Sequence, residues 1–231
     1  MPDRRRRVLV LTAVDAERAA VTAGLSAAGE AAGGTEVHTV GVGLAAAAAR
    51  TTYVLMSRLA VEQARPDLVV CAGIGGGFAP LAPVGSLAVA ETIVAADLGV
   101  QTAEGFTPVA ELGFGRSEHR PPARLSRAVA AALGAAHGPV LTVSTVTGTA
   151  ARAAELAGRH PGAVAEAMEG FGVAEAVALF DIPVLEIRAV SNAVGPRDRA
   201  AWRIGEALAA LTSAFGKLPG VLEVEAAHDD T

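Results

Sequence analysis

The sequence predicts a single α/β domain of three layers, in which helices cover both faces of a central mixed, largely buried sheet. Three observations support this fold class. Apolar runs of strand length alternate with Ala-rich helical stretches along nearly the whole chain. These runs are apolar on both faces, as in a sheet that is covered on both sides. The chain has 231 residues, 52% of them hydrophobic, which is sufficient for a sizeable core.

The first half of the chain alternates strands with helices. RVLVLTAV is an apolar strand that runs directly into a helix, and EVHTVGVG is a second strand followed by an Ala-rich helix. PDLVVCAGIGGG and SLAVAETIVAADLG are two further extended segments, the first of which runs into glycines. These patterns predict strands over 7–14, 36–43, 66–77 and 86–99, and helices over 15–28 and 44–64.

The second half continues the alternation after a Pro- and Arg-rich loop. SRAVAAALGAA is a helix, and GPVLTVSTVTG, GAVAEAMEG and PVLEIRAVSN are the later strands. Further helices are expected after Gly148, Gly170 and Arg199. The domain is expected to span residues 1–217. The polar end of 218–231 predicts a flexible C-terminal tail.

Composition limits the function classes. The formal net charge of −5 gives no electrostatic reason to expect a nucleic-acid partner. No apolar stretch has the length and purity of a membrane span, and the first residues lack a signal-peptide pattern, so we expect a cytoplasmic protein without a membrane partner. The single cysteine, Cys71, excludes an internal disulfide. The five histidines show no metal-ligand spacing, so no metal site is expected.

Polar or glycine-rich segments follow four of the predicted strands. Such α/β sheets place their sites at the carboxyl ends of strands, so these segments are expected to converge on one site. They are residues 14–17, 72–75, 145–149 and 191–192.

The segment CAGIGGGFAP superficially resembles a dinucleotide-binding fingerprint. Phe78 stands at its third glycine position, and Pro80 and Pro83 follow where a helix is required, so that interpretation fails. What remains is a strand ending in a turn, where the backbone of Gly73 and Gly75 can approach a ligand.

Two carboxylates stand out. Glu17 lies at the start of the first helix, where it is either an acid favoured by the helix dipole or a functional group. Glu169 lies at a strand end, where a carboxylate can accept hydrogen bonds from two neighbouring hydroxyls, as a ribose offers. The alternative for Glu169 is a structural ion pair with Arg188.

Five motifs in order carry a family resemblance: TAVDAERAAV, GVG, CAGIGGGFAPLAPVGSLAVAE, AMEG and RAVSN. Through them the chain resembles the nucleoside phosphorylase and nucleosidase superfamily over nearly its whole body. It is similar to the methylthioadenosine/adenosylhomocysteine nucleosidases and, through SNAVGPRDRAAWRI, more closely to the futalosine hydrolase family. The separation of Glu169 from Asn192 agrees with this resemblance.

The resemblance implies a role for each matching residue. Glu17 would orient or deprotonate the attacking water, Glu169 would bind the ribose hydroxyls, and Arg188 would help to hold the water or the carboxylates. Met168 would pack against the sugar. The remaining residues implied in substrate binding are Gly73, Ile74, Gly75, Thr147, Gly148 and Gly170. Ile74 departs from the adenosine-type nucleosidases, which carry serine there.

Asn192 stands where the adenine-directed relatives carry an aspartate. A 6-oxopurine presents acceptors at N7 and O6, which an ionised carboxylate would repel and an amide NH₂ can donate to. A mispaired buried polar edge costs about 1–3 kcal/mol, enough to decide a base preference. Asn192 therefore predicts a 6-oxopurine base.

The resemblance implies hydrolysis of the N-glycosidic bond of futalosine, which yields hypoxanthine and dehypoxanthine futalosine in menaquinone biosynthesis. It implies no metal, no organic cofactor and a homo-oligomer. Arg197 and Trp202 are candidates for binding the benzoate carboxylate on the 5′ side of the substrate. The alternative is that these side chains are simply solvated at the start of a helix.

Three other functions remain open. A purine nucleoside phosphorylase would need a basic phosphate pocket, for which the strand ends offer Arg188 and little else. Another 6-oxopurine nucleosidase would share the same residues. A non-catalytic nucleoside-binding protein of the same fold is disfavoured by the presence of both Glu17 and Glu169.

Overall fold

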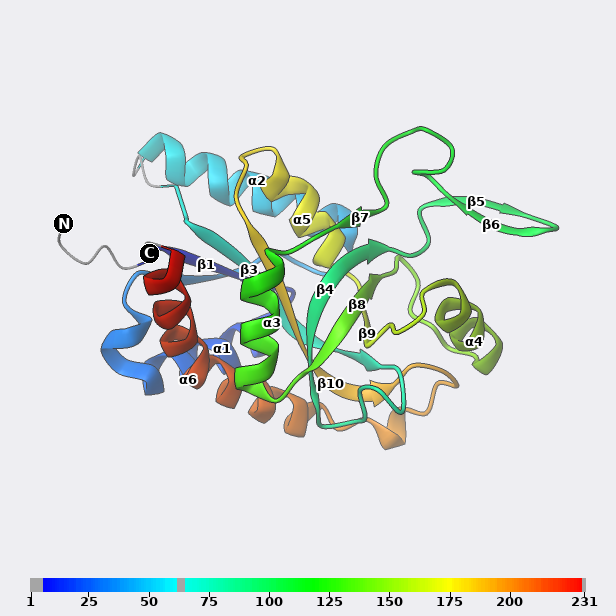
Figure 1. The fold of residues 1–231 in the computed structure, drawn as a ribbon. Coiled ribbons are helices and arrows are strands. Elements are labelled where there is room, and N and C mark those ends of the chain that lie inside the picture. Colours follow the sequence, from blue (N-terminus) through cyan, green and yellow to red (C-terminus); the bar gives the residue numbers. More distant parts are fainter. Residues whose placement is uncertain (1–5, 62–64, 230–231) are drawn as a thin grey trace.

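The computed structural model describes residues 6–61 and 65–229. Helices cover both faces of an eight-stranded mixed sheet, which confirms the predicted fold class (Figure 1). The elements in chain order are β1 (Val8–Thr12), α1 (Asp15–Ala28), η1 (Gly29–Ala32), β2 (Thr35–Thr39), α2 (Leu44–Val61), β3 (Leu68–Gly77), β4 (Leu87–Ala95), β5 (Gly99–Thr102), β6 (Gly105–Pro108), β7 (Glu118–His119), α3 (Ala123–Leu133), β8 (Ala136–Thr142), α4 (Ala150–Arg159), β9 (Ala165–Ala167), α5 (Gly170–Ala178), β10 (Val184–Ala193), η2 (Arg199–Ala201) and α6 (Ile204–Asp229). The last three residues of the helix expected over 44–64 lie outside the described residues.

The sheet closes on itself along part of its width. Its order is β10-β4-β8-β9-β3-β1-β2, with β7 on β4, and β10 also pairs with β3. Strands β10, β4, β8, β9 and β3 therefore form a ring. Strand β10 is parallel to β3 and antiparallel to β4, and its register shifts between Val190 and Asn192. Such an irregularity bends a strand, which suits one shared by two neighbours.

Alternate side chains along the strands belong to two different hydrophobic cores, one on each face of the sheet. In β1, Val8 and Val10 face the core under α1, α3 and α6, whereas Leu9 and Leu11 face the core under α2 and α5. Figure 1 shows α2 and α5 above the sheet and α1 and α6 on the other side. This period of two, apolar on both sides, is why the strands read as continuous apolar runs.

A small hairpin projects from the body beside α4 (Figure 1). Strands β5 and β6 pair only with each other, and the Arg159 guanidinium lies 4.2 Å from the centre of the Phe106 ring. The predicted strand 86–99 ends at Ala95, and the hairpin that follows was not expected. Its four-residue strands are too short and too exposed to produce a periodic apolar pattern.

The prediction of a flexible tail over 218–231 is wrong for most of that segment. Helix α6 continues to Asp229, and Leu218 and Leu222 are only 2% and 5% exposed in the core beneath α1 and α3. With Phe215, these leucines recur at helical spacing, a signal that the polar last residues obscured. Residues 230–231 lie outside the described part of the chain.

Helix α6 is also the one described helix long and apolar enough in composition to cross a membrane. Its buried residues include Leu211 and Phe215, which pack in the core of the domain. A core helix of a folded domain has the same composition, which accounts for this feature.

Candidate active site

The paired strands β3 and β10 organise the candidate site. In their parallel register Arg188 is opposite Gly73 and Asn192 is opposite Gly76. Glu17 approaches β3 from the start of α1, and Glu169 approaches from the junction of β9 and α5. The structure therefore brings Glu17, Gly73, Arg188 and Glu169 together, and two of these, Glu17 and Gly73, come from the segments predicted to converge.

Glu17 is buried and held by backbone groups on both carboxylate oxygens. Its Oε2 accepts hydrogen bonds from Ala13 N at 2.9 Å and Val14 N at 3.2 Å, and its Oε1 accepts from Ile74 N at 2.9 Å. The Ile74 side chain packs against the core, so this residue serves the site through its backbone. These three hydrogen bonds fix the direction of the carboxylate.

Gly73 lies between Glu17 and Arg188. A Cβ atom at this position would be 2.6 Å from Glu17 Oε1 and 2.7 Å from Arg188 Nη1. Only glycine leaves room for both side chains to cross the strand there, which gives a physical reason for a glycine at position 73.

Glu169 is buried and contacts three elements. Its Oε1 accepts from Gly43 N at 3.2 Å, and its Oε2 lies 3.2 Å from Arg188 Nη2. Oε2 also accepts from the backbone N of Met168, a partly buried residue, at 3.3 Å. The ion pair that was the structural alternative for Glu169 is thus present. Glu169 can still accept a hydrogen bond from a hydroxyl, because Oε1 accepts only the bond from Gly43 and keeps one lone pair.

Arg188 lies at the centre of this cluster and is 1% exposed. Its Nε donates to Glu186 Oε1 at 2.9 Å, and its Nη2 donates to Cys71 Sγ at 3.3 Å. Burial opposes the charged guanidinium, but the surrounding thiol and carboxyl groups hold its pKa above the ordinary value. Burial also raises the pKa of the Cys71 thiol, which makes this cysteine unreactive.

Asn192 is partly buried, and its amide is oriented by its neighbour. Ser191 Oγ donates to Asn192 Oδ1 at 2.8 Å and also lies 3.2 Å from the carbonyl oxygen of Gly75. Asn192 Nδ2 donates to Ala193 O at 3.0 Å, which leaves one of its two hydrogens for another acceptor. The oxygen of the amide is therefore held by the protein, and its NH₂ group is the end that can donate to a ligand.

Thr147 and Gly148 lie in the loop between β8 and α4. Thr147 donates from its backbone N and from Oγ1 to the two carboxylate oxygens of Glu166, at 2.9 Å and 2.5 Å. Burial raises the pKa of Glu166, and the two bonds from Thr147 oppose that shift. Sequence reasoning missed Glu166 as a member of the site, although it is the other acid of the apolar segment GAVAEAMEG.

The same loop contacts the segment that follows β10. Gly148 O accepts from Arg197 N at 3.2 Å, and the Arg197 guanidinium lies 5.9 Å from the centre of the Trp202 ring. Arg197 is exposed and Trp202 partly so. The structure thus brings the four residues Thr147, Gly148, Arg197 and Trp202 together, beyond the Asn192 end of β10.

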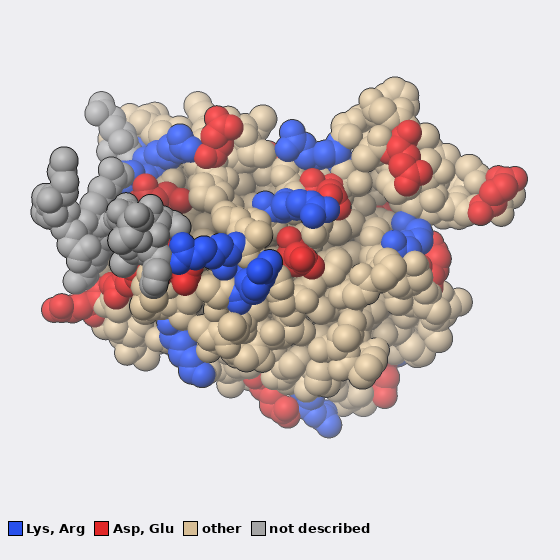
Figure 2. Space-filling view, viewed as in Figure 1, with Lys and Arg blue, Asp and Glu red and all other residues tan. Residues whose placement is uncertain are grey.

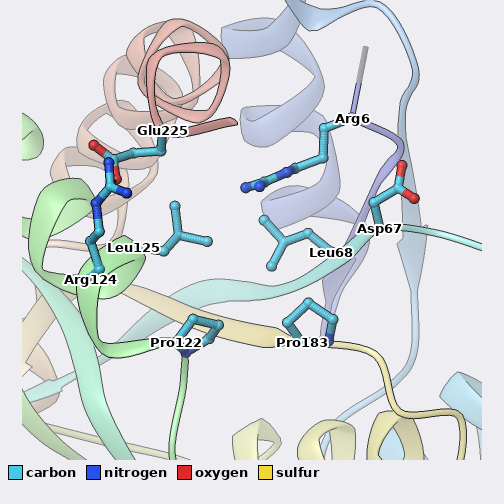
Figure 3. Close-up of a pocket in the computed structure, with 8 residues that line it drawn as sticks. All are labelled: Arg6, Asp67, Leu68, Pro122, Arg124, Leu125, Pro183 and Glu225. Atoms are coloured by element: carbon cyan, nitrogen blue, oxygen red, sulfur yellow. The ribbon is translucent and has the colours of Figure 1, made fainter. Parts of the chain in front are cut away.

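Two other surfaces are distinct from this site. A pocket lined by Asp67, Leu68, Pro183 and Glu225 lies at the opposite, amino-terminal end of β3 and β10 (Figure 3). On the face shown in Figure 2, basic and acidic side chains are interspersed. Within residues 6–61 and 65–229, no group of three His, Cys, Asp or Glu side chains is arranged to hold a metal ion.

Comparison with known proteins defines the class first. The phosphorylase superfamily matches residues 13–222 of this chain. The fold is similar to the crystal structure of a methylthioadenosine/adenosylhomocysteine nucleosidase from Colwellia psychrerythraea, with a TM-score of 0.77 at 19% identity, over 96% of this chain and 98% of that one. It is also similar to the futalosine hydrolase of Helicobacter pylori, with a TM-score of 0.70 at 17% identity, over 96% and 98%.

Two curated relatives then show to which family within this superfamily the chain belongs. The chain is 61% identical to futalosine hydrolase of Streptomyces coelicolor, over 96% of this chain and 99% of the relative. It is 42% identical to futalosine hydrolase of Acidothermus cellulolyticus, over 91% and 89%. The chain belongs to the futalosine hydrolase family, within the phosphorylase superfamily.

Proposed function

We propose that this enzyme hydrolyses the N-glycosidic bond of futalosine and releases hypoxanthine and dehypoxanthine futalosine. The observation that carries the proposal is the full-length relationship to the Streptomyces coelicolor enzyme, which bears this name. The reaction is a cytoplasmic step of menaquinone biosynthesis. The enzyme is a homo-oligomer, a proposal supported by exposed apolar side chains such as Val100 and Phe114 in and beside the projecting hairpin.

Glu17 activates the attacking water. Its carboxylate is fixed by N–H groups of Ala13, Val14 and Ile74, and Oε1, which accepts only the bond from Ile74, keeps a lone pair that can accept from a water. A base held in one direction needs no reorganisation when the water reaches the sugar. The oxygen of the water bonds to C1′ as the bond from C1′ to the base breaks. The proton lost from the water passes to Glu17, and the hypoxanthine anion takes up a proton from solvent.

Glu169 stabilises the sugar as it gains positive charge. N-glycosidic cleavage passes through a transition state in which the ribose resembles an oxocarbenium ion, as in glycoside hydrolysis. A buried carboxylate that accepts from the ribose hydroxyls is more stabilising there than in the ground state. The ion pair with Arg188 supports this role because it holds the carboxylate in one position.

Asn192 stabilises the departing base. The leaving hypoxanthine carries negative charge spread over N7 and O6, and an amide NH₂ donates to such a group as an oxyanion hole does. The bond from Ser191 Oγ to Asn192 Oδ1 supports this role because it keeps the amide oxygen away from the base.

Arg197 and Trp202 bind the 5′ benzoate chain. The guanidinium provides charge-assisted bonds to a carboxylate, and the indole provides a face for an aromatic ring. The contact between Arg197 N and Gly148 O supports the proposal, because it connects this segment to a loop that is itself implied in substrate binding.

A specific observation favours hydrolysis over phosphorolysis. Arg188 is the arginine at the centre of the cluster, and two of its nitrogens are already paired with carboxylates, Nε with Glu186 and Nη2 with Glu169. A phosphate that approached Arg188 would meet these two negative charges, whereas a neutral water would not.

The test is base release with and without phosphate: hypoxanthine from futalosine and from inosine, and adenine from methylthioadenosine. We expect release from futalosine that does not depend on phosphate. Release that requires phosphate would identify a phosphorylase. Equal turnover of inosine and futalosine would identify a general 6-oxopurine nucleosidase, and tight binding without turnover would identify a binding protein.

A further inference from the structure

Glu186 is a fully buried carboxylate that the mechanism above does not use. It lies in the middle of β10, two residues before Arg188, and its side chain is 0% exposed. Residues two apart in a strand point to the same face, so Glu186 and Arg188 lie side by side. A buried carboxylate within an otherwise apolar strand is costly unless a partner compensates it.

The guanidinium of Arg188 connects Glu186 to Glu169. Its Nε donates to Glu186 Oε1 at 2.9 Å, and its Nη2 lies 3.2 Å from Glu169 Oε2. The guanidinium is planar, so two partners on different nitrogens fix its rotation as well as its position. Glu186 therefore determines which part of the guanidinium faces Glu169.

Helix α5 provides the other side of this arrangement. A Cβ atom at Gly170 would lie 2.1 Å from Glu186 Oε2, so the carboxyl group touches the Cα of the first residue of the helix. The residue immediately before is Glu169. A carboxylate at a helix N-terminus is stabilised by the helix dipole. Gly170 is thus needed to admit Glu186, which lies against the backbone that carries Glu169.

We propose that Glu186 is a positioning residue, which orients Arg188 so that it pairs only with Oε2 of Glu169 and leaves the remaining lone pair of Oε1 for a ribose hydroxyl. This inference deepens the proposed function and rests on it. Without Glu186, the guanidinium is free to rotate and to pair with both oxygens of Glu169, because arginine favours bidentate pairing with a carboxylate. That pairing would occupy the lone pair of Oε1 that the sugar needs.

Two substitutions separate positioning from simple charge compensation. Glu186→Gln keeps an oxygen that can accept from Arg188 Nε, so the orientation is retained. Glu186→Leu has similar volume but no acceptor, so the orientation is lost. We expect kcat on futalosine to fall by about ten- to a hundredfold in Glu186→Leu, as misplacement of a catalytic group does. We expect Glu186→Gln to remain within about threefold of the parent.

The pH profile gives a second readout. The titratable groups around Arg188 are Glu186, Glu169, Glu17 and Cys71. Burial raises the pKa of Glu186, and Arg188 opposes the shift. In Glu186→Gln, Arg188 no longer shares its charge with a second carboxylate. The carboxyl group whose pKa burial raises is also absent, so we expect the acid limb of kcat/KM that Glu186 contributes in the parent to be lost in Glu186→Gln.

The experiment compares the parent, both variants and Glu36→Gln as a control. Glu36 pairs with the largely buried Arg58 at the edge strand β2, outside the candidate site. We would measure kcat and KM for futalosine from about pH 5 to 8, the range over which perturbed carboxylates titrate, together with Tm. Parental kcat in Glu186→Leu would overturn the proposal. Losses in both variants that only follow a lower Tm would also overturn it.

A structural readout separates this inference from the proposed function. The Nε–H signal of Arg188 in an NMR spectrum is expected to be protected from exchange in the parent and in Glu186→Gln, and to lose that protection in Glu186→Leu. A parent that releases no hypoxanthine would disprove the proposed function. An unchanged Nε–H signal in Glu186→Leu would disprove the positioning role, whatever the activity of the parent.

Discussion

Glu17, Glu169 and Arg188 lie in the interior of the protein, whereas Arg197 and Trp202 lie on an outer segment that follows β10. The interior groups are held by backbone N–H groups and by one another, at 2.9–3.3 Å. The outer pair is connected to the body through one backbone bond and a ring contact at 5.9 Å.

This difference separates the groups that act in the chemical step from the groups that recognise the substrate. Groups that stabilise developing charge are effective when they are preorganised and shielded from water. Groups that recognise a substrate substituent can lie on exposed, adaptable loops. Substitutions in the interior should therefore reduce kcat, and substitutions in the outer segment should mainly raise KM. The following predictions test this division, from the largest expected effect to the smallest.

Glu17→Gln should abolish most hydrolysis without loss of base binding, because an amide cannot accept the proton from water. We expect kcat to fall by about a thousandfold. Steady-state kinetics with futalosine and calorimetry with hypoxanthine would measure the two properties separately. A parental rate would show that some other group activates the water.

Glu169→Gln should reduce kcat by about a hundredfold, because the lost interactions with the ribose strengthen as the sugar gains charge. Kinetics and thermal unfolding would be measured on the same preparation. A loss of activity that merely follows a lower Tm, or near-normal turnover, would contradict a role in ribose binding.

Asn192→Asp should change which base is preferred. An ionised carboxylate repels N7 and O6 of hypoxanthine, so kcat/KM for inosine-type substrates should fall by roughly tenfold and partly recover at low pH. Activity on the matching adenine nucleoside should rise relative to the oxopurine, since a carboxylate accepts from the 6-amino group. An unchanged ratio of kcat/KM for the two bases would mean that this residue does not contact the purine edge.

Arg197→Ala should raise KM for futalosine by roughly fivefold, since an exposed charge-assisted contact contributes about 1 kcal/mol. The KM for inosine, which lacks the benzoate chain, should not change. Arg199→Ala, a neighbouring exposed arginine, is the matched control. Equal effects of the two substitutions on both substrates would place Arg197 among the solvated side chains.

Much of the fold was predictable because its signals are local. The apolar run before Asp15 and the helix that starts there follow from adjacent residues. The predicted helix start agrees with α1, whereas β1 ends at Thr12, two residues before the predicted end of the strand. The hairpin β5–β6 was not predictable from periodicity, since its strands are short and exposed. The end of α6 was misjudged because polar residues in 227–231 outweighed the apolar spacing of Leu218 and Leu222.

The sequence by itself determined the order of the main strands and helices, apart from the hairpin β5–β6 and the short strand β7. It also determined the two-sided burial of the sheet and the identity of the polar residues at the strand ends. These properties follow from periodicity and from turn residues, which act within a few positions of the chain. The tertiary structure decided the closure of the sheet through β10 and β3, and it decided the partners of each charged group. Gly73 lies between Glu17 and Arg188, and Glu186 lies against Gly170, because strands far apart in the chain pair there. A sequence shows which carboxylates are present, but only contacts between distant segments determine which of them share an arginine.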